Sequence, residues 1–440
     1  MINNRKIGLF ALTNIVVGNM VGVGAYMIPA ALAKYGTFAV VGWIVGSMGA
    51  VFLALVFAWL SQWTDAPGGP YVYVRKVFGK FAGYQMAVSY WIMGPVGNAG
   101  LIVSPLGYLS TFCPAFASNH WLSASFGLAM IWGFTWLNFF EIKVVSSVQI
   151  FGTVLKVAPL ILFGVLGIFL FDPHILNQPA IVSDASGGLG ALSCVSSAAA
   201  VSMWSFIGLE SGTVPSDSIN NPKKTVFRAT IIGVLVVALV YILGCIAIMS
   251  IIPQEVLMKS PAPYVDAVTL ICGPTSGFVM AVVGIIGLVF SLNGWIFIPG
   301  YVARCAAEDG LFPKFFLKTN KNNAPTAGLI CGSIIMSIIF LMGYADGFVE
   351  RVEKIVLLGT YATIVPYLYC AAAMLIGAVK KMDGLDVNPR LAVFVSLLAF
   401  LYAIWIVVGS GHEVVYAGSL MLFAITPFYF ILHRKLGQKA

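Results

Sequence analysis

Two ionisable side chains, Lys156 and Glu210, stand inside long apolar stretches of the sequence. An ionisable residue at the centre of a membrane helix costs about 2.5–3.5 kcal/mol on insertion scales, so such residues are usually functional. Burial in an apolar medium favours the neutral form of either group. Each group can then exchange a proton when its surroundings change, and we interpret both as proton-coupling residues.

Each of these two residues also has a structural interpretation. Glu210 as a neutral carboxyl group hydrogen-bonded inside a helix bundle would need no role in coupling. Lys156 as a snorkelling side chain would reach an interface. However, about ten residues separate it from the nearer end of its apolar stretch, which is too far at a rise of about 1.5 Å per residue.

Two glycine-rich interruptions, at 18–24 and 205–212, divide stretches that would otherwise form unbroken membrane helices. Unpaired backbone groups are tolerated at membrane depth only where they line a cavity or bind something polar. Secondary transporters build their substrate sites in this way. Glycines that merely allow two helices to pack closely are the alternative explanation.

The two interruptions offer complementary backbone groups. N–H groups of the first would bind a substrate carboxylate, aided by the positive end of the half-helix that follows. Carbonyl groups of the second, from Trp204 to Ile207, would accept hydrogen bonds from a substrate ammonium group. The expected carboxylate-binding residues are Asn19, Gly22, Val23 and Gly24.

The composition is that of an integral membrane protein. Of the 440 residues, 60% are hydrophobic and 9% are charged, and the mean hydropathy is +0.96. Soluble globular domains do not have this composition. A helix of roughly 20 residues crosses the hydrocarbon core of a bilayer. We predict twelve such spans, near residues 8–34, 38–62, 82–112, 121–140, 146–171, 189–215, 226–251, 276–303, 326–344, 353–378, 391–409 and 413–433.

The basic residues indicate how the chain is oriented. With a cytoplasmic N-terminus and twelve spans, most of the 24 lysines and arginines fall in cytoplasmic loops, in agreement with the positive-inside rule. We therefore expect a multi-pass protein of the bacterial cytoplasmic (inner) membrane with both termini cytoplasmic. The net charge of +8 then reflects orientation in the lipid bilayer, and no nucleic-acid partner is expected.

The seven cysteines and four histidines form no pattern typical of a metal site or a catalytic group. We expect no metal, no cofactor and no enzyme activity. No linker divides the sequence, which predicts one transmembrane domain over 1–440. Because spans one and six are both interrupted, residues 8–171 and 189–378 are candidate inverted repeats, with two additional helices over 391–433. The predicted fold is therefore all-α, with a 5+5 inverted repeat and broken helices 1 and 6.

Several short motifs occur in the same order as in a known family. The chain resembles the basic amino acid/polyamine antiporters of the amino acid, polyamine and organocation (APC) superfamily, with the closest likeness to the bacterial arginine/agmatine antiporters. The resemblance extends almost from end to end. The motifs are Gly18-Asn19-Met20 with Gly22 and Gly24, the segment 67–71, Trp204 to Ser211, Asn221 to Lys224, Glu308 to Pro313, and Val365 to Tyr369.

The resemblance implies particular roles at the gates of the pathway. It makes Trp204 a gate that stacks over the substrate side chain, and Tyr90 and Tyr367 further gate residues. The alternative for all three is a packing role. The matching glutamate of the family supports proton coupling by Glu210. Lys156 departs from the arginine/agmatine pattern and instead resembles proton-coupled permeases of the superfamily, in which an amine takes the place of a sodium ion between spans 1, 5 and 8.

The resemblance also implies a substrate subsite, with differences in this chain. Asn98 and Trp295 match positions that contact the distal part of the substrate. The chain has Val23 and Gly359 where the family has serines. It also has Met93, Gly94 and Pro95 where the family has a small residue, a cysteine and a tryptophan. These changes make the pocket less polar, so an arginine-sized cation fits it less well.

Together these features predict a secondary active transporter that exchanges an amino acid, cationic and arginine-like, for its amine or another amino acid by alternating access. The alternative is a sodium-independent, proton-coupled permease for a less polar amino acid that uses Lys156. A channel is disfavoured because the sequence lacks charged rings and a carbonyl-filter motif. The expected partners are a small amino acid or amine, protons and lipid. A homodimer is compatible with the sequence, which does not fix the oligomeric state.

Overall fold

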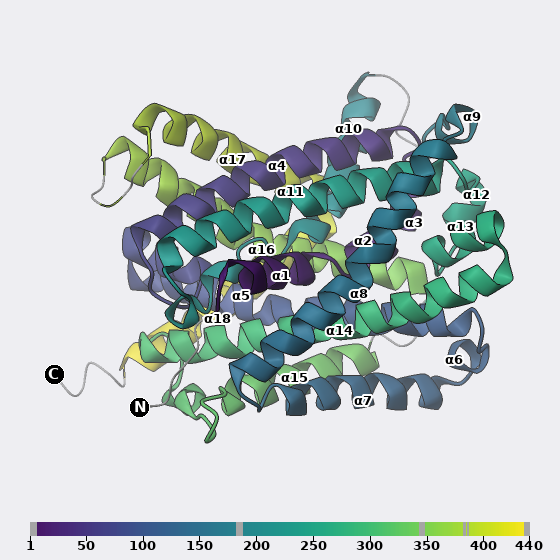
Figure 1. Ribbon diagram of the computed structural model, residues 1–440. Coiled ribbons are helices and arrows are strands. Elements are labelled where there is room, and N and C mark those ends of the chain that lie inside the picture. The colour runs from purple at the N-terminus through teal and green to yellow at the C-terminus, as the bar shows by residue number, and fades with distance from the viewer. Residues whose placement is uncertain (1–6, 182–187, 343–347, 382–383, 385–386, 435–440) are drawn as a thin grey trace.

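The computed structural model describes residues 7–181, 188–342, 348–381, 384 and 387–434. Within these ranges every regular element is a helix, and one isolated bridge joins Ile7 to Ile219 (Figure 1). The predicted all-α class is therefore confirmed.

Nine of the helices described in these ranges are long and apolar enough to cross a membrane. The first, fourth and ninth predicted spans correspond to a broken helix and to the shorter helices α7 (His120–Leu137) and α15 (Thr326–Met342), so the count of twelve stays a prediction. The nine are α4 (Phe38–Trp63), α5 (Pro70–Ser110), α8 (Ile142–Phe169), α10 (Gly188–Met203) with the turns after it, α11 (Pro222–Met249), α14 (Pro274–Glu308), α16 (Phe348–Val379), α17 (Pro389–Gly409) and α18 (His412–Arg434).

Local sequence signals explain where many of these helices begin. Proline has no N–H group and a fixed φ near −65°, so it suits the first position of a helix. Pro70, Pro222, Pro274 and Pro389 each occupy that position. Short helices at loops complete the fold: α6 (Ala115–Ser118), α9 (Pro173–Leu176), α12 (Gln254–Leu257), α13 (Pro263–Cys272) and the 3-10 turn η4 (Lys314–Leu317).

Both predicted interruptions are present. The helix α1 (Leu9–Met20) ends where Val21 is extended, and α2 (Val23–Tyr26) and α3 (Ile28–Ala33) continue the span. After α10 the chain forms only 3-10 turns, η1 (Trp204–Phe206), η2 (Ser211–Thr213) and η3 (Ser216–Ser218). Gly208 lies between η1 and η2 with φ +112°, a conformation that side chains other than glycine rarely adopt.

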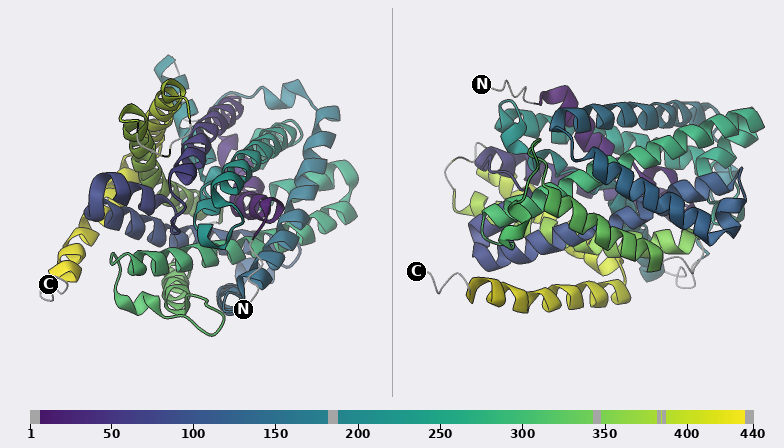
Figure 2. Two further views of the ribbon diagram at one scale, coloured as in Figure 1. Left: turned by 60° about the vertical axis from the view of Figure 1, so that its left-hand side comes forward. Right: turned by 90° about the horizontal axis from the view of Figure 1, so that it is seen from below.

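The long helices form a bundle around the two broken spans (Figures 1 and 2). The helix α1 packs against α8, α11 and α14, while α5 packs against both α14 and α16. The helix α18 runs along the outside of the bundle (Figure 2) and has the smallest buried share of the nine candidate spans. The broken spans therefore lie inside the protein, away from lipid.

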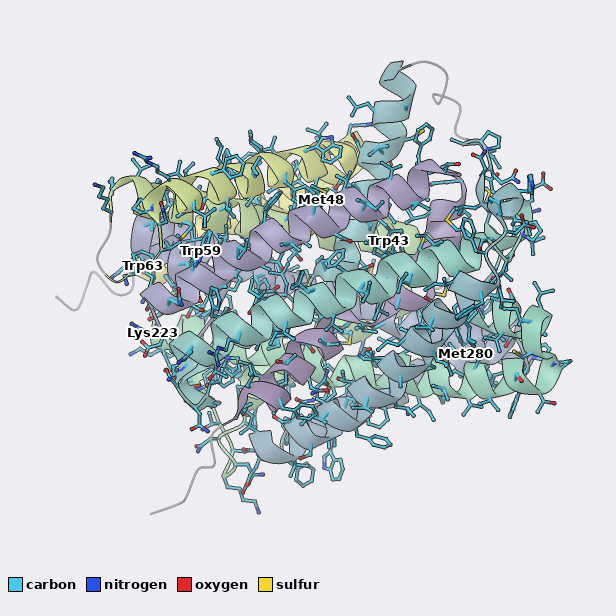
Figure 3. All side chains as sticks on the ribbon, turned by 45° about the horizontal axis from the view of Figure 1, so that its top comes forward. Trp43, Met48, Trp59, Trp63, Lys223 and Met280 are labelled. Carbon is cyan, nitrogen blue, oxygen red and sulfur yellow. The ribbon has the colours of Figure 1, made fainter. Side chains whose placement is uncertain are left out.

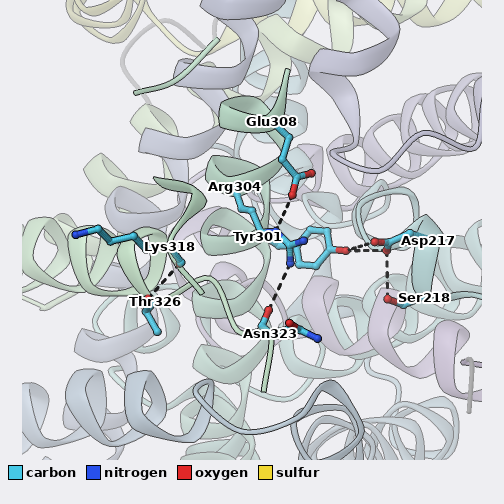
Figure 4. A network of polar contacts seen from close by, with 8 residues as sticks. All are labelled: Asp217, Ser218, Tyr301, Arg304, Glu308, Lys318, Asn323 and Thr326. Carbon is cyan, nitrogen blue, oxygen red and sulfur yellow. Dashed lines mark hydrogen bonds and ion pairs between the residues drawn. The ribbon is translucent and has the colours of Figure 1, made fainter. Parts of the chain in front are cut away.

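At one end of the bundle, polar side chains tie loops together. Figure 4 shows Tyr301 of α14 reaching Asp217, with the hydroxyl 2.6 and 2.7 Å from the two carboxylate oxygens. Arg304 pairs with Glu308 at 2.8 Å and donates to the carbonyl of Asn323. The segment after the second interruption is thereby held against α14.

The same end carries basic residues and the beginning of the described chain. Lys223 and Trp63 both lie toward this end, while Met280 lies toward the other end (Figure 3). Arg75 pairs with Asp309 at 2.7 Å. This clustering of basic residues fits the orientation predicted from the sequence.

Candidate substrate-binding site

The two interruptions lie against each other at the centre of the bundle. A methyl group added at Gly24 would lie 2.1 Å from the Ser205 Oγ and 2.8 Å from the Ser205 Cα. One added at Gly208 would lie 3.1 Å from the backbone of Asn19. The glycines therefore allow two irregular segments to touch backbone to backbone, which explains why both interruptions are rich in glycine.

A tyrosine on a third helix joins the same two segments. The Tyr241 hydroxyl of α11 lies 2.7 Å from the carbonyl oxygen of Met20 and 3.2 Å from that of Ser205. These carbonyl groups are released by the ends of regular helix, and a buried acceptor without a donor is costly. Tyr241 supplies that donor and fixes the junction.

Gly24→Ala should disrupt this junction. The new methyl group would meet the Ser205 backbone at 2.8 Å, so the two interruptions must move apart. We expect transport activity per folded molecule to fall by at least about tenfold, because overpacking of this kind costs about 1–3 kcal/mol. Gly133→Ala on α7 is the matched control, since a methyl group there meets nothing within 4 Å. Equal activities of the two variants would contradict the close packing.

A narrow cavity opens beside this junction. It has about 30 Å³ open to the centre of a water molecule. Most of the predicted substrate-binding residues line it, and every lining residue is uncharged. The lining residues are Asn19, Met20, Gly22, Gly24, Met93, Gly94, Gly97, Asn98, Leu101, Trp204, Ile207 and Trp295.

The first interruption presents donors to this cavity. The first N–H groups of a helix have no partner within it, and the helical bonds of α2 begin with Ala25, whose N–H lies 3.1 Å from the Gly22 carbonyl oxygen. The Asn19 Nδ2 atom is buried and has no hydrogen-bond partner among the described residues. The Val23 side chain lies outside the described part of the structure, so the effect of replacing serine by valine there stays a prediction.

The second interruption offers fewer acceptors than the sequence predicts. The carbonyl of Trp204 accepts from the Ile207 N–H at 3.1 Å, and that of Phe206 accepts from the Leu209 N–H at 3.2 Å. Of the four carbonyls from Trp204 to Ile207, three already accept a hydrogen bond, because 3-10 turns pair their own backbone groups and Tyr241 reaches Ser205. The Ile207 carbonyl accepts no hydrogen bond from any described residue and is the remaining acceptor.

Asn98 and Trp295 form a series of hydrogen bonds along the wall of the cavity. The Trp295 indole N–H donates to the Asn19 carbonyl at 2.8 Å, and the Asn98 amide donates to the Trp295 carbonyl at 2.9 Å. They connect α5, α14 and the end of α1. Both line the cavity, and direct contact with a substrate stays a prediction for each.

Glu210 lies within the second interruption, between Gly208 and η2, with no exposed surface. Its carboxylate accepts hydrogen bonds from the hydroxyl groups of Tyr90 on α5 and Tyr367 on α16. The Gly208 N–H donates to it at 3.1 Å. The structure thus brings the predicted gate tyrosines and the predicted coupling residue into one group, which links the second interruption to α5 and α16. Glu210 itself does not line the cavity.

Lys156 lies on α8 and is fully buried, where α8 packs against α1 and α14. Its ammonium group donates to the Gly18 carbonyl at 2.6 Å and to the Ser291 hydroxyl at 2.7 Å. Ser291 in turn lies 3.2 Å from the Val21 carbonyl. The lysine therefore joins α8, α14 and the broken end of α1, which are spans 5, 8 and 1 of the sequence prediction.

A chain of buried amides extends from Asn19 and was missed in the sequence. Gln149 donates to Asn19 Oδ1 at 3.3 Å, and Asn293 donates to Gln149 Oε1 at 3.1 Å. Asn138 lies 3.3 Å from Asn293. Uncharged polar residues inside apolar spans were the available signal, since a buried amide is usually hydrogen-bonded. They position Asn19 at the cavity.

Two broken membrane helices that meet at a buried cavity define the protein as a membrane transporter of the broken-helix type. The sequence pattern of the amino acid permease family matches residues 7–431, and the chain belongs to this family. It is therefore a multi-pass membrane transporter and not an enzyme.

Relatives with assigned names extend over nearly the whole chain. The cadaverine/lysine antiporter of Escherichia coli (strain K12) is 29% identical over 98% of this chain and 95% of its own length. The putrescine transporter PotE of the same strain is 29% identical over 99% of this chain and 98% of its own. PotE of Haemophilus influenzae is 27% identical over 99% of both chains. These names support amino acid and amine transport, and the special likeness to arginine/agmatine antiporters stays a prediction.

Proposed function

We propose that this protein is a secondary active amino acid transporter that works by alternating access and needs no sodium. The observation that carries the proposal is the junction of the two interruptions at a buried cavity. Donors at the start of α2 and on Asn19 suit a carboxylate, and the Ile207 carbonyl suits an ammonium group. A zwitterionic amino acid carries both groups on one carbon atom.

The contacts of Lys156 support independence from sodium. A cation at the junction of α1, α8 and α14 would be held by oxygen atoms of these helices, and the lysine ammonium group already binds two of them. We assign proton coupling to Lys156 and Glu210, because each is buried and joins a broken span to its neighbours. Tyr90 and Tyr367, which bind Glu210, and Trp204, which lines the cavity, act as gate residues.

The substrate side chain separates two candidates. Exchange of a cationic, arginine-like amino acid for its amine is favoured by the relatives named for lysine, cadaverine and putrescine. A proton-coupled permease for a less polar amino acid is favoured by the uncharged lining of the cavity. The site geometry supports the second candidate better, because a buried cation without a carboxylate partner is costly.

We further propose that twelve spans with a 5+5 inverted repeat form the transporter, over 8–171 and 189–378, with both termini in the cytoplasm of a bacterium. The basic residues at the end of the bundle that holds Arg75 and Arg304 support this orientation.

Counterflow in proteoliposomes tests the proposed function. We expect unlabelled amino acid trapped inside to accelerate uptake of labelled amino acid, because a carrier returns faster when loaded. Replacing sodium by potassium should leave the rate unchanged. A rate that follows only the concentration gradient would indicate a channel, and the absence of uptake for every amino acid and amine tested would reject the proposal.

A further inference from the structure

We propose that Gly97 and Gly359 form a seat for the Trp204 indole, meaning that the ring packs directly against the backbone at both glycines. The ring in this position closes the part of the cavity that would hold the substrate side chain, so the transporter selects amino acids with small, uncharged side chains. The inference rests on the proposed function and concerns which substrates the same site accepts. Its basis is the contact between this ring and two long helices, α5 and α16.

The seat is defined by what a larger residue would meet. A methyl group added at Gly359 would lie 2.1 Å from the Cζ3 atom of Trp204 and 2.8 Å from its Cη2 atom. One added at Gly97 would lie 2.7 Å from the same Cη2 atom. The outer edge of the indole therefore rests directly against the backbones of both helices, in space that any side chain at either position would occupy.

Glycine is otherwise unfavourable at these two positions. Both lie in the interiors of long helices, where glycine costs about 0.8–1.0 kcal/mol relative to alanine. Neither has the positive φ that would require glycine. The close approach of the Trp204 ring supplies the reason for glycine at both.

The position of the ring limits the length of the cavity. Trp204 and Gly97 both line it, so the seated indole forms its wall at α5. The other lining residues with side chains are all uncharged, and the Asn98 amide already donates to the Trp295 carbonyl. They are Asn19, Met20, Met93, Asn98, Leu101, Ile207 and Trp295. A long cationic side chain would meet a closed wall and no carboxylate among the lining residues, whereas a small neutral side chain fits.

Truncating the ring should extend the range of substrates. Trp204→Leu leaves the seat empty and joins its space to the cavity. We expect the ratio of methionine to alanine affinity to rise by about tenfold or more, as expected when a hydrophobic pocket gains room for a methylene group. Thermal stabilisation of the detergent-solubilised protein by each amino acid measures binding even if the variant no longer transports.

Filling the seat should have the opposite effect. Gly359→Ala would expel the ring toward the cavity and weaken binding of alanine by about tenfold, because overpacking costs about 1–3 kcal/mol. The double variant Gly359→Ala/Trp204→Leu should recover binding, because the added methyl group no longer meets the ring. Gly332→Ala on α15 is the matched control, since its methyl group meets nothing within 4 Å.

The outcomes separate this inference from the proposed function. If unmodified protein binds and exchanges lysine or cadaverine as well as alanine, or if Trp204→Leu leaves the methionine-to-alanine ratio unchanged, the seat does not select substrates. If Gly359→Ala binds alanine as well as Gly332→Ala does, or if adding Trp204→Leu does not restore binding, the Trp204 ring does not pack against Gly359 as proposed. The proposed transport of amino acids by alternating access survives all these results, because it is rejected by the absence of counterflow for every amino acid and amine and not by the choice of substrate.

Discussion

Lys156→Ala should lose net proton-driven uptake by at least about tenfold, because hydrogen bonds to a charged group contribute about 1.5–3 kcal/mol each. The variant removes two such bonds, to Gly18 at 2.6 Å and to Ser291 at 2.7 Å. One-for-one exchange should fall much less, since the loaded carrier can still alternate when no proton must be released. The measurement compares net uptake driven by a pH gradient with counterflow in the same proteoliposomes.

Two further variants sharpen this result. Lys156→Met keeps most of the side-chain volume and removes the charge, so it should show the same loss of net uptake with less loss of folded protein. Lys259→Ala changes an exposed lysine and should leave both transport modes intact. A loss that is equal in both modes and proportional to folded protein would make Lys156 structural. Uptake that requires sodium in the unmodified protein would also reject its role as a substitute for the ion.

Glu210→Gln should remove the pH dependence of uptake while substrate binding persists. An amide exchanges no proton, and it resembles the neutral carboxyl group. The variant should therefore behave at high pH as the unmodified protein behaves at low pH. Its amide nitrogen replaces one of the two carboxylate oxygens and cannot accept, so one of the hydrogen bonds from Tyr90 and Tyr367 is lost and the gate should open more readily.

The measurement is the initial rate of uptake as a function of pH, because a carboxyl group that exchanges a proton makes the rate depend on pH and an amide does not. Substrate binding by thermal stabilisation shows that the site is intact. Glu255→Gln, at an exposed glutamate of α12, is the matched control and should keep the native profile. If Glu210→Gln also keeps that profile, Glu210 takes no part in coupling.

The sequence predicted correctly those features that depend on local chemistry. Long apolar runs have to form membrane helices, and glycine-rich segments inside two of these runs interrupt helices, as at Val21 and Gly208. The burial of Lys156 and Glu210 followed from their distance from the ends of the apolar runs. These properties depend on neighbouring residues and on the solvent, so they can be derived without knowing which helices meet.

The partners of those residues were decided by tertiary packing. The sequence does not show that Tyr90 and Tyr367 both reach Glu210, or that the Lys156 ammonium group reaches the Gly18 carbonyl. Gly97 and Gly359 belong to different helices, and the reason for glycine at both becomes visible only when the Trp204 ring packs against them. The sequence by itself determined a membrane transporter with two broken spans and buried ionisable groups, because apolar runs and glycine act locally. The shape of the cavity and the hydrogen-bond partners were decided only by the tertiary structure, because they depend on contacts between residues that lie more than a hundred positions apart.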